Sequence, residues 1–169
     1  MILQKSMFFN SSNSDRLYNA ADFASYFGKL VSNGIFYGSA DNLRVSIGSG
    51  MGVSIAAGSA WANGYCYENT DTFALTLPTA NGANPRIDRI VVRWSLADRS
   101  MILAVLTGAP SSIPAAPALT RTNETYELCL ADVLIPKSSI AVVTANITDT
   151  RLEPLLCGLI NSLVTAVYE

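Results

Sequence analysis

The segment Pro85-Arg-Ile-Asp-Arg-Ile-Val-Val-Arg-Trp94 decides the fold of this chain, because its side chains follow the two-residue period of a β-strand. Ile90, Val92 and Trp94 fall on one face of the strand, and Arg89 and Arg93 fall on the other. With several arginines and a single aspartate, the strand must pair its cations with other segments or present them to water or to a partner. It therefore predicts a sheet with one apolar face and one arginine-bearing face.

The two-residue period recurs along most of the chain. Strands are expected at residues 43–47, 51–55, 73–77, 101–106, 125–135 and 140–144. Asn63-Gly64 lies between two strand-like segments, and Asn-Gly is a strong hairpin signal because both turn residues need positive φ. Short strands separated by turns favour a sandwich or barrel. The predicted fold is mainly β: an antiparallel β-sandwich over residues 1–150, with one short N-terminal helix and a C-terminal helix.

The N-terminal helix is expected at about residues 19–33. Asn19 followed by Asp22 resembles an N-cap with a carboxylate in the first turn, and Asn33-Gly34 provides a stop. Five apolar residues repeat at helical spacing; they are Phe23, Tyr26, Phe27, Leu30 and Val31. An aromatic stripe at this spacing is typical of a helix face that packs into the core.

Residues 151–169 are expected to form a C-terminal helical tail. Pro154 suits a first helical turn, and four leucines step by four, three and four residues in a heptad-like pattern. These candidates for an oligomer interface are Leu152, Leu156, Leu159 and Leu163. The helix could pack on its own sandwich or bundle with symmetry-related copies, and the sequence leaves both arrangements open.

The composition indicates a subunit of a larger assembly. The chain has 169 residues, enough for one domain or one domain with a short appendage, and 50% of them are hydrophobic. Charged residues make up 14%, against about 25% in typical globular proteins, and the mean hydropathy is +0.30. No uncharged apolar run approaches the roughly 20 residues of a spanning helix, and the N-terminus lacks a signal-peptide pattern. We therefore expect no membrane insertion and apolar surface that is covered by other subunits, in a homo-oligomer.

Charge and residue types argue against several functions. The net charge of −2 and the pI of about 5.1 argue against a nucleic-acid binder. The three cysteines are isolated and are expected to be buried small hydrophobes rather than metal ligands. Histidine is absent, which removes histidine-activated nucleophiles and histidine metal sites. No cofactor or metal is expected.

A glycosidase would need two carboxylates that face each other about 5–10 Å apart. Glu127 and Asp132 lie five positions apart on one predicted strand, so they are expected on opposite faces, as solvated charges. No other carboxylate pair is brought together by the sequence pattern. The chain is therefore not expected to be an enzyme.

Six charged residues are candidates for ion pairs or for an interface; they are Arg86, Asp88, Arg89, Arg93, Asp149 and Arg151. The first four could form an anion site, an Asp–Arg network that locks the strand to a loop, or an intersubunit contact, because planar guanidinium groups suit partly buried carboxylates. Asp149 is expected to cap the turn into the tail helix, while Arg151 pairs with Asp88 or another acid.

Three aromatic residues surround the predicted Asn63-Gly64 hairpin. Together with Trp94, the residues Trp61, Tyr65 and Tyr67 could stack on the rings of a bound sugar. Cross-strand pairing of the aromatic rings explains the same residues without a ligand. Both interpretations stay open at the level of the sequence.

The order of several short motifs carries a resemblance to a known family. They are Tyr18-Asn-Ala20, Leu43-Arg-Val45, Gly58-Ser-Ala-Trp61, Asn63-Gly-Tyr65, Arg86-Ile-Asp-Arg-Ile-Val-Val-Arg93, Tyr126-Glu-Leu-Cys-Leu-Ala-Asp-Val133 and Ile147-Thr-Asp-Thr-Arg151. Over roughly residues 8–158 the chain resembles the N-terminal module of baseplate and receptor-binding tail proteins from long-tailed phages of Gram-positive bacteria. More narrowly, it is similar to a small tail-tip protein of a Bacillus phage, with the shoulder domain of lactococcal-phage receptor-binding proteins as the expected fold relative.

This resemblance implies a structural role in a virion tail. Such modules are β-sandwiches that anchor a fibre or head to the baseplate, usually as trimers, so other tail or baseplate proteins are the implied partners. Receptor-binding relatives continue into a neck and a sugar-binding head, which the 169 residues here do not supply. Anchoring is therefore the expected function, and contact with a host-surface carbohydrate is the alternative.

Overall fold

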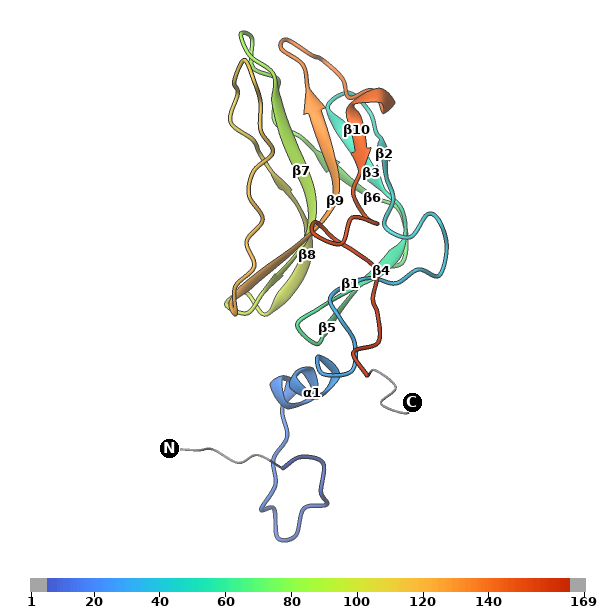
Figure 1. The fold of residues 1–169 in the computed structure, drawn as a ribbon, viewed down its shortest axis with the longest axis vertical. Coiled ribbons are helices and arrows are strands. Elements are labelled where there is room, and N and C mark those ends of the chain that lie inside the picture. Colours follow the sequence, from blue (N-terminus) through green and yellow to red (C-terminus); the bar gives the residue numbers. More distant parts are fainter. Residues whose placement is uncertain (1–5, 165–169) are drawn as a thin grey trace, which may run out of the picture.

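The computed structural model describes residues 6–164, and it is mainly β with antiparallel strand pairing (Figure 1). In chain order the elements are α1 (Ala20–Phe27), β1 (Gly34–Ile35), β2 (Val45–Ile47), β3 (Gly52–Ile55), β4 (Gly58–Ala62), β5 (Tyr65–Asn69), β6 (Phe73–Thr76), β7 (Arg86–Ser95), β8 (Ser100–Leu106), β9 (Thr125–Ile135), the 3-10 helix η1 (Thr144–Asn146) and β10 (Ile147–Asp149).

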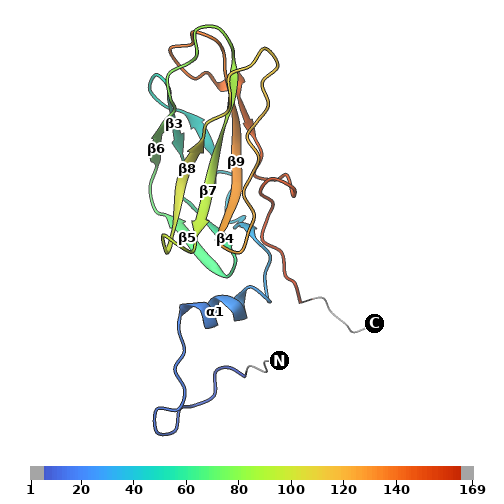
Figure 2. The same ribbon diagram turned by 90° about the vertical axis from the view of Figure 1, so that its left-hand side faces the viewer.

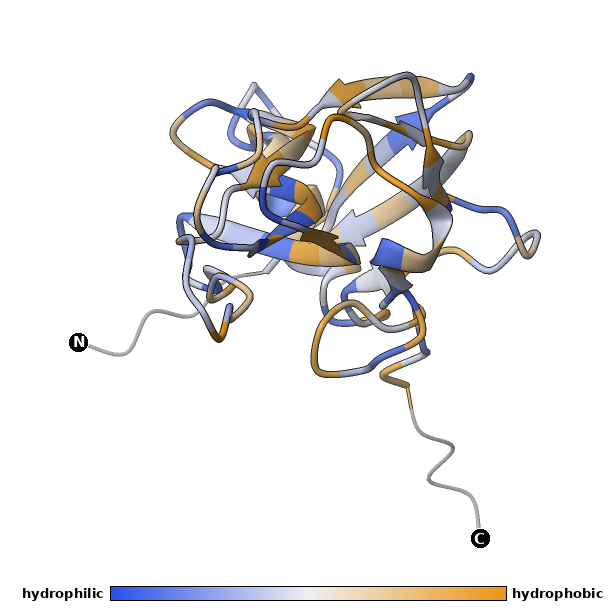
Figure 3. Ribbon diagram, turned by 90° about the horizontal axis from the view of Figure 1, so that it is seen from above, coloured by the Kyte–Doolittle hydropathy of each residue, from blue (hydrophilic) through white to orange (hydrophobic). Residues whose placement is uncertain are grey.

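The strands form three antiparallel sheets. The largest has the order β10-β9-β7-β8, and two three-stranded sheets have the orders β2-β3-β6 and β1-β4-β5. The long strands β7 and β9 run side by side through the body, whereas α1 and the segment before it lie beyond one end of the sheets (Figures 1 and 2). Seen from above, the strands carry both apolar and polar positions (Figure 3).

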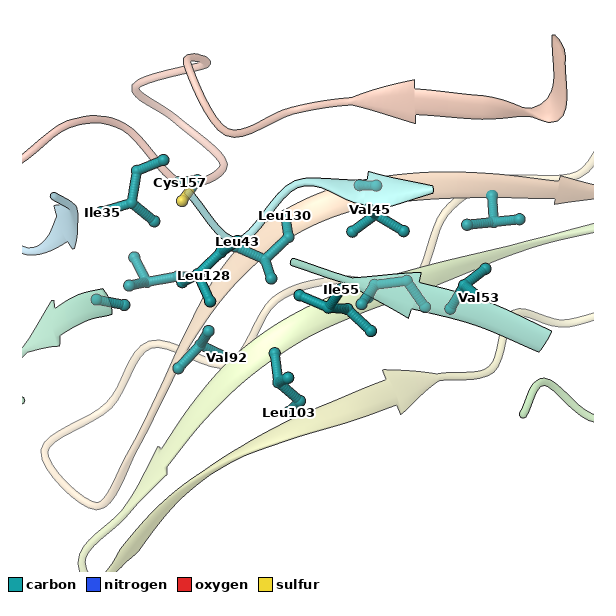
Figure 4. Packing of buried hydrophobic residues seen from close by; sticks show 14 of the residues in the cluster. Ile35, Leu43, Val45, Val53, Ile55, Val92, Leu103, Leu128, Leu130 and Cys157 are labelled. Atoms are coloured by element: carbon teal, nitrogen blue, oxygen red, sulfur yellow. The ribbon is translucent and has the colours of Figure 1, made fainter. Parts of the chain in front are cut away.

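One hydrophobic cluster joins the sheets. Val53 and Ile55 of the β2-β3-β6 sheet pack with Val92 and Leu128 of the four-stranded sheet, and all four are at most 1% exposed (Figure 4). Ile90, Val92 and Trp94, which were predicted on the apolar face of β7, all belong to this cluster. The apolar face of the decisive strand is thus confirmed as the centre of the core.

The strand predicted at residues 140–144 is wrong. Residues 139–143 are irregular and lead into η1, and the antiparallel partner of β9 is instead β10, three residues further along. The backbone N–H of Val142 donates to Gly50 O at 2.9 Å, so this segment bonds across to the β2–β3 turn rather than to β9. Ile140, which the alternation placed in a strand, is 88% exposed.

Helix α1 begins where the sequence predicts but ends six residues early. The Asn19 side chain accepts from Asp22 N, and the Asp22 carboxylate accepts from Asn19 N, which completes a capping box. The helix ends at Phe27, and the following residues bond to the C-terminal segment: Ser32 N donates to Asn161 O at 2.8 Å. Competition from this long-range pairing ends the helix before Asn33-Gly34.

The aromatic stripe of this helix does not lie in the core, so that prediction is wrong. Phe23 is 47% exposed, and Tyr26 and Phe27 are each 42% exposed. The reason is the position of α1 beyond the end of the sheets, where its rings contact one another, Phe8 and, through Phe27, Trp61 of β4 (Figure 2).

The predicted C-terminal helix is also wrong throughout residues 151–164, which form turns and isolated bridges; residues 165–169 of the prediction lie outside the described part of the chain. Gly158 has a φ of +82°, which breaks a helix. The segment then pairs with β1, because Ile35 N donates to Gly158 O at 3.0 Å and Ile160 N donates to Ile35 O at 3.1 Å. Leu152 and Leu156 thus lie in turns, and Leu159 lies where the segment pairs with β1.

The Asn63-Gly64 hairpin positions α1 against the sheet. Asn63 and Gly64 have φ values of +52° and +82°, as the turn requires. A Cβ atom added to Gly64 would lie 1.9 Å from the carbonyl oxygen of Ala24 in the helix. The helix backbone therefore rests directly on the turn, and this contact needs a glycine.

We expect Gly64→Ala to lower the melting temperature and to release α1 from the hairpin. The left-handed backbone alone costs alanine about 1–2 kcal/mol, and the clash with Ala24 adds to it. Thermal unfolding followed by circular dichroism measures the effect. Gly82→Ala is the matched control, since nothing lies within 4 Å of its added Cβ. Equal melting temperatures for the two variants would contradict the contact.

Candidate functional site

Arg86 and Asp88 form a buried ion pair at one end of β7. Arg86 Nε lies 2.9 Å from Asp88 Oδ1, and the two side chains are 4% and 0% exposed. The remaining guanidinium donors bond to the carbonyl oxygens of Thr79, at 2.8 Å, and Pro78. Asp88 also accepts from Gly108 N at 2.9 Å. The pair therefore fixes the loops before β7 and after β8, and its donors serve the chain's own oxygens.

Arg89 and Arg93 pair with carboxylates on the neighbouring strand β9. Arg89 Nε lies 2.9 Å from Asp132 Oδ1, and Arg93 Nε lies 2.8 Å from Glu127 Oε1. These residues are direct cross-strand partners in the sheet register. The arginine-bearing face of β7 thus finds its acids on β9, within the same chain.

The same two ion pairs hold the segment between β8 and β9 against the outer face of the sheet. Arg89 donates to Pro117 O at 2.7 Å, and Glu127 accepts from Thr120 N at 2.7 Å. In Figure 1 this segment runs alongside β7. Prolines in this extended segment have no backbone N–H to donate to a neighbouring strand. Charged side chains of the sheet hold the segment in place instead.

A β-bulge overturns the expected placement of the carboxylates. Ile90 pairs with Ala131 and Val91 pairs with Cys129, so Leu130 has no partner and the alternation of β9 reverses at this point. Glu127 and Asp132 consequently lie on the same face rather than on opposite faces. Glu127 is also only 1% exposed, so its predicted solvated state is wrong.

Sharing a face does not make these carboxylates a hydrolytic pair. Their partners Arg89 and Arg93 are four residues apart along β7, which separates the two sites by roughly 13 Å at the usual rise per residue. Glycosidase carboxylates are about 5–10 Å apart. Each acid is also held in an ion pair with its own arginine.

Arg151 connects β10 to the loop that precedes β2. Its guanidinium bonds Asp149 at 2.9 Å and 2.7 Å, and it donates to the carbonyl oxygens of Ala40 and Asn42 at 3.1 Å and 2.6 Å. The acid that pairs with Arg151 is thus Asp149 and not Asp88. Asp149 also accepts from Arg151 N at 3.1 Å, which closes a local turn where a helix cap was predicted.

The four leucines do not share one surface. Leu152 and Leu163 are 58% and 50% exposed, whereas Leu156 and Leu159 are partly buried. Leu159 packs at the edge of the core cluster opposite Ile35. Without the predicted helix the heptad spacing does not place the four leucines on one helix face, and their role in an oligomer interface stays a prediction.

The three aromatic residues of the hairpin lie on two faces of the β1-β4-β5 sheet. Tyr65 and Tyr67 are in register with Ala62 and Ala60, which are buried, and both tyrosines pack against the core. Trp61 alternates with those alanines and contacts Phe27 and Phe36 instead, at centroid distances of 5.9 Å and 6.3 Å. Neither a joint sugar platform nor a Trp61–Tyr65 cross-strand pair exists.

The cysteines divide into two buried residues and one exposed residue. Cys129 and Cys157 are buried, and burial raises the pKa of each thiol to about 12. Cys66 is exposed on β5, which contradicts the expectation for that residue. The two buried thiols therefore stay protonated at neutral pH and act as small apolar groups.

Within residues 6–164, no group of three or more Cys, Asp or Glu residues is arranged to hold a metal ion. No helix in the described part of the chain is long and apolar enough to cross a membrane. Comparison with known proteins finds no matching family model, no matching curated protein and no matching solved structure.

Truncation of the buried acid tests the role of the first ion pair. We expect Asp88→Ala to destabilise the protein by about 3–5 kcal/mol, because it leaves the buried Arg86 charge uncompensated. Urea denaturation followed by circular dichroism measures the change. Asp41→Ala removes the exposed partner of Arg44 and should cost no more than about 1 kcal/mol. Similar losses in both variants would contradict a special role for the buried pair.

The Asp149–Arg151 pair predicts a pH-dependent contribution to stability. Hydrogen bonds from Arg151 hold the pKa of Asp149 below its usual value. Its charged form therefore adds stability above the unfolded pKa of about 3.9, and this stability is lost as the pH falls through the lower folded pKa. Asp149→Asn should melt below the wild type at pH 7, and the difference should shrink below about pH 4. A melting-temperature difference between Asp149→Asn and the wild type that stays constant between pH 2.5 and 7 would contradict this linkage.

Proposed function

We propose that this protein is a structural component of a phage tail tip or baseplate, which assembles through contacts with copies of itself and with other tail proteins. It serves as a part of the virion and performs no catalysis. The observation that carries the proposal is an exposed group of aromatic rings, here termed the aromatic surface, formed by Phe8, Phe23, Tyr26 and Phe27.

The aromatic surface has the properties of a surface that a partner covers. Its rings contact one another at centroid distances between 5.1 Å and 5.7 Å, and each residue remains at least 40% exposed. Contiguous exposed apolar surface is uncommon on soluble monomers, and aromatic residues are enriched at protein interfaces. Its position beyond the sheets leaves room for neighbouring subunits without disturbing the core (Figure 2).

We further infer that the two sheets sharing the core cluster form a two-layer antiparallel β-sandwich. The β2-β3-β6 sheet and the four-stranded sheet contribute inward residues to the same cluster, which is the packing that a sandwich requires (Figure 4). A rigid sandwich with an apolar appendage at one end suits an anchoring module. This arrangement agrees with the resemblance to tail-protein modules, and a trimer is the favoured assembly.

Solution mass tests the assembly role. We expect a mass three times that of the 18.0-kDa chain in light scattering, and labelled antibodies should bind the tail tip of intact particles. Phe23→Asp together with Tyr26→Asp should shift the mass to the monomer, because charges would lie in the covered surface.

The control is Ile140→Asp, which alters an 88% exposed residue at the opposite end of the molecule and should leave the mass unchanged. Circular dichroism establishes that each variant keeps its β structure. A wild-type monomer at high concentration, or particles without label at the tail, would rule out the proposal.

Contact with a host-surface carbohydrate is a second candidate function. It is favoured by one specific observation, the tilted ring pair formed by Tyr65 and Trp94 beside an open groove. Both residues belong to the set of four aromatic residues, Trp61, Tyr65, Tyr67 and Trp94, that the sequence offered for sugar stacking.

A further inference from the structure

A groove of about 500 Å³ lies between the start of α1 and the β7–β8 turn. Residues from three separate parts of the chain line it, among them Asn19, Tyr65, Trp94, Leu96, Arg99 and Met101. It contains the ring pair of Tyr65 and Trp94, whose centroids are 5.5 Å apart with an angle of 33° between the ring planes. The groove therefore offers the partly exposed Tyr65 ring together with polar groups from the helix and the turn.

Trp94 provides an unused hydrogen-bond donor in this groove. The residue is only 5% exposed, and its indole N–H makes no hydrogen bond with any described residue. Among the described residues, only the indole nitrogen of Trp61 is both fully buried and without a hydrogen-bond partner. The Trp94 nitrogen is therefore not fully enclosed, and its residue lines the groove. A donor without a protein partner can form a hydrogen bond to an acceptor that a ligand supplies.

The charge in the groove is positive. Arg99 is exposed, and within residues 6–164 its guanidinium has no hydrogen bond or ion pair. No aspartate or glutamate lines the groove. The nearby Asp98 carboxylate accepts from the Ser95 hydroxyl at 2.7 Å. At the start of α1, the N–H groups of Ala20 and Ala21 have no acceptor within the helix.

We propose that this groove binds an anionic saccharide, namely a pyranose ring that carries one carboxylate or phosphate group. The sugar ring packs against the partly exposed Tyr65 ring, a hydroxyl accepts from the Trp94 indole N–H, and the acidic group pairs with Arg99. A neutral sugar would leave the guanidinium unpaired, and a simple anion would leave the Tyr65 ring uncovered. This inference rests on the second candidate function, contact with a carbohydrate, and does not depend on the assembly role.

Indole NMR resonances provide a direct test, because the chain has two tryptophans and hence two indole N–H signals. Trp94→Phe identifies the Trp94 signal by its loss. Titration with glucuronic acid and with glucose 1-phosphate should shift the Trp94 signal saturably, while the Trp61 signal serves as the internal reference. The two ligands separate carboxylate from phosphate recognition. Glucose and inorganic phosphate, each alone, should bind at least about tenfold more weakly.

Variants of the groove separate the two contacts. Arg99→Asn suits the left-handed backbone at this position, where φ is +50°, and should reduce the affinity for the acidic sugars about tenfold or more. Trp94→Phe should weaken binding about fivefold to tenfold, as measured through the NMR signals of the ligand itself. Arg44→Gln changes an exposed arginine outside the groove and should bind like the wild type.

Several outcomes would overturn the inference. They are equal affinity for glucose and for the acidic sugars, an identical shift with phosphate alone, and an unchanged Trp94 signal at saturating ligand. A Trp94 signal that is protected by a second copy of the chain would show that the groove is a subunit contact. The first three of these results do not bear on the mass or the virion labelling that test the assembly role.

Discussion

The central constraint on this structure is that β7 is hydrogen-bonded on both sides and still carries three arginines. A guanidinium group on a central strand must find an acid or a carbonyl oxygen, because burying it unpaired is costly. Asp88, Asp132 and Glu127 meet this requirement within the chain. The same side chains bond to the loops around the sheet, so charge neutralisation and loop fixation are accomplished together. The arginine-rich strand is thus explained without an external anion.

Local pattern was sufficient for much of the β architecture. The alternation around Ile90 and Val92 placed the core face of β7, and the Asn63-Gly64 turn and the Asn19 cap were confirmed. The bulge at Leu130 could not be found this way, because counting by twos assumes an unbroken ladder. One extra residue in β9 was enough to move Asp132 to the face that Glu127 occupies, and thereby to change the expected arrangement of the acids.

The helix predictions failed where long-range contacts override local periodicity. The leucines near the C-terminus fit a heptad, yet Gly158 and Ile35 bring this segment into extended pairing instead. Spacing likewise identified the apolar stripe on α1, but it could not show that the helix lies beyond the sheets. The groove was missed for a related reason, since Tyr65, Trp94 and Arg99 are distant in sequence and only the folded chain brings them together.

The pairing between the segment after α1 and the C-terminal segment has a mechanical consequence. Leu163 N donates to Leu30 O and Ser32 N donates to Asn161 O beside an antiparallel bridge, and Ile160 N donates to Ile35 O at a parallel bridge, so these bonds form a short ladder. Tension applied between residues 30 and 163 acts at the open end of this ladder, so its hydrogen bonds break one after another. A pull on the two ends is therefore absorbed by these few weak links before any load reaches β7 and β9.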